Sequence, residues 1–299
     1  MRLLLDDEGE PRALWRVLLF VPIYLFAAAI FGGLLSPLHR LPGLAGESVG
    51  ASGRLLAALL AGGFLLVALD RRRPGALGFA WTRAVPRELA LGLAITGGAL
   101  CVVVAGLALA GELRWTPDRG SAGGYALALV RDLPLWGVAA AGEEALFRGY
   151  AFQAMARGIG AIPATLVASI GFAAGHWRNP NLDAIALTNI FLAGVLLSVA
   201  YLRTRSLWFA TALHTGWNWM MGTVLALPVS GLVLVNTPLY DGHELGPRWV
   251  TGGPFGPEGG LAATVAFALA LVLVLRVPLA ESARMRALRP LVDSSAPRS

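Results

Sequence analysis

The chain has 299 residues, of which 56% are hydrophobic and 14% charged, and its mean hydropathy is +0.66. Soluble proteins carry about 25% charged residues, so this composition excludes a soluble globular domain. The net charge of +6 comes from arginines that lie between apolar blocks, a pattern that indicates membrane topology rather than nucleic-acid binding. The single cysteine, Cys101, excludes an internal disulfide or a cysteine metal cluster.

The apolar blocks predict an all-α fold, a polytopic membrane bundle of about eight transmembrane helices. Each block is long enough to cross a hydrocarbon core of roughly 30 Å. The acidic start MRLLLDDEGEPR is unlike a secretory signal, and we expect none. The predicted spans cover residues 13–35, 54–70, 88–111, 126–156, 161–177, 182–202, 206–227 and 260–279.

These spans divide the chain into six parts. We expect a cytoplasmic N-terminal segment (1–12), N-terminal transmembrane helices (13–111), a core with the polar motifs (126–227), a Gly/Pro-rich extramembrane loop (228–259), a last transmembrane helix (260–279) and a cytoplasmic tail (280–299). The last dozen residues are expected to be disordered. We expect Asp241, His243 and Glu244 to be solvated rather than to bind a metal, and the loop that contains them to be able to cover the outer face.

The arginines predict the orientation in the membrane. With both termini in the cytoplasm, 17 of the 24 arginines fall on the inner side, as the positive-inside rule favours. We assign the remainder to the opposite side and its helix ends: Arg40, Arg54, Arg114, Arg119, Arg131, Arg178 and Arg248. We expect Arg131 to pair with Asp132 near the interface.

The first polar motif is GEEALFRGY at residues 142–150. A charged side chain at mid-bilayer costs about 2.5 to 3.5 kcal/mol, so a carboxylate there requires a partner or a task. Glu144 precedes Arg148 by four residues, the favourable orientation for a helical ion pair. Glu143 is turned about 100° away on the helix. We therefore predict that Glu144 is structural and that Glu143 is free to react.

The second motif places Phe172 and His176 four residues apart. His176 lies 33 positions after Glu143, and Gly158, Gly160 and Pro163 interrupt the helical pattern midway. If this break is the tip of a helical hairpin, Glu143 and His176 each lie roughly 22 Å from it along their helices. The two side chains are then expected at the same depth.

The third motif places His214 and Asn218 on one face of a helix, because residues four apart are stacked. The preceding turn, residues 203–206, is expected on the same membrane side as the hairpin tip, so both residues can reach the same layer. The sequence thus predicts that one carboxylate, two imidazoles and an amide converge in a water-accessible pocket inside the membrane.

This set of groups suits hydrolysis of an amide bond in two ways. In one, Glu143 with His176 activates a water, and His214 and Asn218 donate hydrogen bonds to the oxyanion. In the other, His176, His214 and Glu143 bind a zinc ion whose water is the nucleophile. The HExxH spacing of many zinc proteases is absent. The sequence therefore leaves open whether the protein uses zinc or no cofactor.

In order and spacing, the motifs EExxxR, FxxxH and HxxxN resemble the CPBP family, which comprises type II CAAX prenyl endopeptidases and related bacterial abortive-infection or bacteriocin-processing proteins. The resemblance implies an intramembrane protease, metal-dependent or glutamate-dependent, in which Glu143, His176, His214 and Asn218 are catalytic and Glu144, Arg148 and Phe172 support them. The arginine-only chain is typical of a GC-rich bacterial genome, so we expect the bacterial inner membrane and a membrane-associated peptide or protein as substrate, not a prenylated CAAX protein.

Two other functions are compatible with intramembrane ionisable residues. A non-catalytic scaffold or immunity protein could use the same fold to bind a partner in the bilayer. A proton-coupled transporter could use Glu, His and Arg as a proton relay, but inverted repeats, which would favour it, are not evident.

Overall fold

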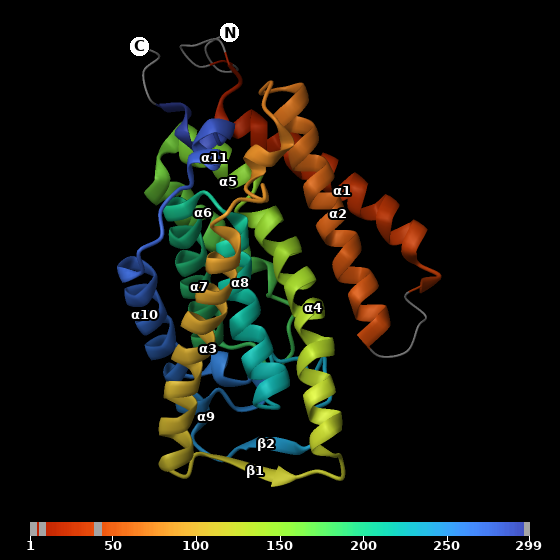
Figure 1. Ribbon diagram of the computed structural model, residues 1–299, viewed down its shortest axis with the longest axis vertical. Helices are drawn as coiled ribbons and strands as arrows, with labels where there is room; N and C mark the ends of the chain where they lie inside the picture. The colour runs from red at the N-terminus through yellow and green to blue at the C-terminus, as the bar shows by residue number, and fades with distance from the viewer. Residues whose placement is uncertain (1–4, 6–9, 39–43, 296–299) are drawn as a thin grey trace.

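The computed structural model describes residues 5, 10–38 and 44–295, and these form a bundle of helices (Figure 1). The long helices are α1 (Ala13–Leu35), α2 (Leu44–Ala68), α3 (Val85–Leu109), α4 (Ala122–Phe147), α6 (Ala161–Gly175), α7 (Ala184–Thr204), α8 (Leu207–Trp219) and α10 (Leu261–Arg276). The shorter elements are α5 (Tyr150–Ile159), α9 (Arg248–Thr251), α11 (Ala283–Leu288), a π-helical turn (Met220–Val224), and the strands β1 (Leu113–Pro117) and β2 (Tyr240–Glu244). The predicted all-α bundle is confirmed.

Several helices are suited to a bilayer. Within the described residues, four helices are long and apolar enough to cross a membrane: α1, Ser48–Ala68 of α2, α3 and α7. The apolar helices α6 and α10 are shorter. Because α4 and α8 carry the polar motifs and pack against each other and against α2 and α3, their polar groups face protein. The chain is an integral membrane protein.

The predicted span 126–156 is wrong as a single helix, because α4 ends at Phe147 and α5 begins at Tyr150. The chain turns at Gly149, where a Cβ atom would lie 2.1 Å from the carbonyl oxygen of Ala145. Only glycine permits that approach. The predicted break at Gly160 is confirmed, since its φ is 90°. Helix α5 packs against α1 and α6 at the end of the bundle where α11 lies (Figure 1).

The opposite end of the bundle carries two strands that were not predicted. Strand β1 pairs antiparallel with β2, from Leu113 opposite Glu244 to Pro117 opposite Tyr240. The C-terminal region also differs from the expected disordered tail. The N–H of Leu291 donates to Gln153 Oε1 of α5 at 2.8 Å, and Leu291 and Val292 are buried. The predicted N-terminal segment 1–12 lies largely outside the described residues.

Close packing of α3 on α8 positions the third motif. A Cβ atom at Gly92 of α3 would lie 2.5 Å from that of Ala212, and one at Gly216 of α8 would lie 2.8 Å from the Cα of Leu93. The hydroxyl of Thr96 donates to the carbonyl oxygen of Leu213 at 2.6 Å. The backbone contact therefore fixes the rotation of α8 at the turn that carries His214.

Candidate active site

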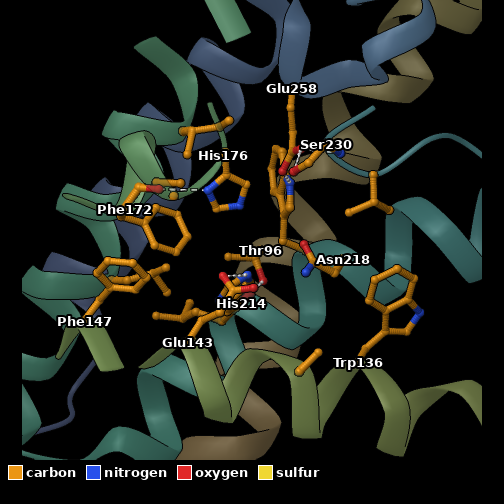
Figure 2. Close-up of a pocket in the computed structure, with 18 of the residues that line it drawn as sticks. Thr96, Trp136, Glu143, Phe147, Phe172, His176, His214, Asn218, Ser230 and Glu258 are labelled. Atoms are coloured by element: carbon orange, nitrogen blue, oxygen red, sulfur yellow. Dashed lines mark hydrogen bonds and ion pairs between the residues drawn. The ribbon is translucent and has the colours of Figure 1, made fainter. Parts of the chain in front are cut away.

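A cavity of about 540 Å³ lies between α4, α6, α7 and α8. Its lining includes Glu143 of α4, His176 at the end of α6, and His214 and Asn218 of α8 (Figure 2). The structure thus brings together in one cavity the four side chains that the sequence analysis singled out from three separate motifs.

The ion pair expected within the first motif is present and fully buried. Arg148 donates from Nη1 to Glu144 Oε1 at 3.2 Å and from Nη2 to the carbonyl oxygen of Gly194 in α7 at 3.0 Å. Its guanidinium also lies 4.5 Å from the centre of the Phe172 ring, within the range of a cation–π interaction. Arg148 therefore links the end of α4 to both α6 and α7.

His214 is held by the same carboxylate. Its Nδ1 lies 2.9 Å from Glu144 Oε1, and a carboxylate accepts, so Nδ1–H is the donor. The other ring nitrogen, Nε2, lies 3.9 Å from Glu143 Oε2. The sequence analysis expected Glu143 beside His176, whereas the structure pairs it with His214. Among the described residues, Glu143 Oε2 has no hydrogen-bond partner.

His176 and Asn218 complete the lining. The Nδ1 of His176 lies 2.8 Å from the carbonyl oxygen of Phe172, and because a carbonyl only accepts, Nδ1 carries the hydrogen. In the neutral ring, Nε2 then has a free lone pair. The amide of Asn218 makes no side-chain hydrogen bond to the described part of the chain. The His176 ring can therefore accept a hydrogen bond at Nε2, and the Asn218 amide can donate one.

The residues do not fit a three-ligand zinc site in this arrangement. No group of three His, Cys, Asp or Glu residues within the described ranges lies close enough to bind one ion. The set suggested by the sequence, His176, His214 and Glu143, lines the cavity without forming such a cluster.

Glu258 lines the cavity and was not predicted as a site residue. Its carboxylate accepts hydrogen bonds from Trp217 Nε1 at 2.8 Å and from the Ser230 backbone N–H and hydroxyl at 2.8 and 2.6 Å. These bonds tie the loop between α8 and α10 to the wall of the cavity (Figure 2). The glycine-rich GGPFGPEGG stretch around Glu258 was the available signal.

Arg54 was also missed, because counting charges for topology assigned it to the outer side or a helix end. It lies inside α2, which begins at Leu44 and ends at Ala68, and it lines the cavity. Helix α2 approaches α4 at Gly142, where a Cβ atom would lie 3.3 Å from the backbone nitrogen of Leu55. Arg54 and Glu143 therefore flank the same helix contact.

Together, the fold and the cavity define a polytopic membrane protein with a carboxylate, imidazole and amide site buried inside its helical bundle. Residues 126–220 match the family model described as Rce1-like, type II CAAX prenyl endopeptidase. The matched segment contains all three motifs, so this core is similar to that family of prenyl endopeptidases. No curated protein matches the chain.

Proposed function

We propose that the protein is an intramembrane endopeptidase that hydrolyses peptide bonds of membrane-associated peptides or proteins. The observation that supports this most strongly is the convergence of Glu143, His176, His214 and Asn218 on one cavity. The match of residues 126–220 to a protease family model also supports it. A carboxylate without a hydrogen-bond partner beside imidazoles is the arrangement that water activation requires.

In the proposed reaction, Glu143 takes a proton from a water that also donates to His176 Nε2, and the water oxygen attacks the peptide carbonyl. The amide of Asn218 donates to the oxyanion, and His214 donates from Nε2 when its ring is protonated. Glu143 then returns the proton to the leaving amine. Glu144 and Arg148 hold His214 and the end of α4 in place.

The proposed test of function is Glu143→Gln. This change keeps the size of the side chain and removes the base, so cleavage by purified protein should fall by about 10²- to 10⁴-fold. Thermal stability in detergent should stay close to that of the wild type. The matched control is Asp241→Asn, an exposed acid in β2, which should cleave normally.

Wild-type rates for Glu143→Gln would exclude Glu143 as the base. If a non-catalytic scaffold were the correct function, neither the wild type nor either variant would cleave. Comparing the membrane proteomes of strains with wild-type and Glu143→Gln protein would identify the accumulated substrate.

We further propose metal-free chemistry, because Asn218 is a poor zinc ligand but a good oxyanion donor. A chelator should then leave the cleavage rate of the purified protein within about twofold. Elemental analysis of active protein should find less than stoichiometric zinc. Loss of activity on chelation, restored by added zinc, would establish the metalloprotease alternative instead.

For the location, we propose the bacterial inner membrane, with both termini in the cytoplasm. The distribution of arginines supports this orientation. The start of α1 and helix α11 also lie at the same end of the bundle (Figure 1).

A further inference from the structure

Arg54 differs from the other charged groups of the cavity. Among the described residues that line the cavity it is the one arginine, and its ionisable companions are Glu143, His176, His214 and Glu258. Its guanidinium makes no hydrogen bond or ion pair with any residue in the described ranges, and its side chain is exposed. By contrast, Arg148 in the same region is fully buried and paired.

Arg54 has no evident structural task. It lies six residues after the first residue of the apolar span Ser48–Ala68 and 14 before the last. A charged side chain within a membrane span calls for a partner or a task. The packing of α2 on α4 is made at Gly142 by the backbone around Ala51 and Leu55 and does not use the Arg54 side chain.

The surroundings of Arg54 select the charge of its ligand. A planar guanidinium matches a carboxylate in a two-point hydrogen bond. The two carboxylates that line the cavity, Glu143 and Glu258, repel an acidic group, and the oxygens of Glu258 already accept from Trp217 and Ser230. An acidic group that enters the cavity is therefore directed to Arg54.

We propose that Arg54 is a specificity residue that binds a carboxylate of the substrate, and that it thereby sets which peptide bond lies at Glu143. This inference rests on the proposed function. The carboxylate belongs either to the free C-terminus of the substrate or to an Asp or Glu side chain near the cleaved bond. In both cases the protein prefers a substrate with an anionic group a short distance from the cleavage site.

The test uses full-length protein in detergent and quenched fluorogenic peptide libraries. One library has free C-termini, a second is the same but amidated, and a third is amidated with Asp and Glu replaced by Asn and Gln. For the wild type, kcat/KM should be at least about tenfold higher with the library that carries the recognised carboxylate than with the matching library that lacks it. A difference in cleavage between the first two libraries would identify the free C-terminus as the recognised carboxylate. A difference between the last two would identify an Asp or Glu side chain.

The variant Arg54→Gln should bring the ratio between charged and neutral arms to about one, mainly through KM, and Arg54→Lys should restore part of it because the charge remains without the fork. The matched control is Arg87→Gln, an exposed arginine at the start of α3, which should keep the preference. Equal cleavage of all arms by the wild type, or an unchanged ratio in Arg54→Gln, would overturn the proposal.

A binding measurement separates this inference from the proposed function. Peptides of the preferred arm should bind the Glu143→Gln protein about tenfold more tightly than neutral peptides, and the added Arg54→Gln change should remove that difference. Carboxylate-selective binding without cleavage by the wild type would retain the Arg54 site and refute the peptidase. Cleavage without carboxylate preference would retain the peptidase and refute the Arg54 site.

Discussion

At the scale of single residues, one oxygen atom connects two of the three motifs. Glu144 Oε1 accepts from both Arg148 Nη1 and His214 Nδ1, at 3.2 and 2.9 Å. Glu144 and Arg148 are fully buried. Loss of this carboxylate would leave a buried guanidinium without its counter-ion and an imidazole without its orienting acceptor.

We therefore expect Glu144→Gln and Arg148→Met each to lower the free energy of unfolding by about 3 to 5 kcal/mol, the usual cost of an unpaired buried charge. Denaturant unfolding in detergent would measure it. The control is Arg286→Gln, which removes an exposed arginine 3.7 Å from Glu281 and should cost less than about 1 kcal/mol. Equal losses in buried and exposed variants would contradict a structural role for the Glu144 pair.

The residue-level prediction from sequence succeeded where spacing alone determines contact. Glu144 and Arg148 are four apart on one helix, and they pair. The bond from His214 to Glu144 joins α8 to α4, and it depends on how each helix is rotated. That rotation is fixed by contacts such as the one at Gly92, which spacing within a motif does not encode. Arg54 was missed because its charge was counted as part of the membrane topology.

At the scale of elements, the loop after α8 is part of the site rather than a linker. Its strand β2 pairs with β1, and Glu258 joins it to Trp217 of α8. At the end of β2, burial raises the pKa of the Glu244 carboxyl from 4.5 to about 8. Exposed carboxyls such as Asp241 lie in the same strand.

The Glu244 shift makes a pH prediction. The folded protein keeps this proton up to about pH 8, whereas the unfolded chain loses it near its ordinary pKa. The stabilisation is therefore full below about pH 4.5 and is lost as pH rises towards 8. The melting temperature should fall over this range less in Glu244→Gln than in the wild type or in Asp241→Asn. Identical pH profiles for all three would disprove it.

Helix positions were largely predictable from apolar blocks, and the break at Gly160 from its neighbours. The strands were not, because β1 and β2 are short and are separated in the sequence by five α-helices, α4 to α8. The end of α4 was missed because glycine does not always end a helix. Gly194 and Gly216 lie within α7 and α8, whereas Gly149 ends one through a contact with Ala145.

At the scale of the whole molecule, cysteine labelling at the two ends of the bundle would test its orientation in the membrane. In a Cys101→Ser background, a cysteine at Ser282, beside α11, should react with an impermeant maleimide only in inverted membrane vesicles. A cysteine at Thr116 in β1 should react in spheroplasts, with at least a tenfold difference in labelling between the two preparations. The opposite pattern would place both termini outside and contradict the charge distribution.

The ring of Phe172 lies 4.9 Å from the centre of the His176 ring and 5.8 Å from that of His214, and Arg148 covers it at 4.5 Å. This phenyl group therefore acts as a spacer between the two imidazoles. A smaller residue at position 172 would change their separation without touching either histidine, so a substitution there would alter the distance between the two rings to which water activation and oxyanion binding are assigned in the proposed reaction.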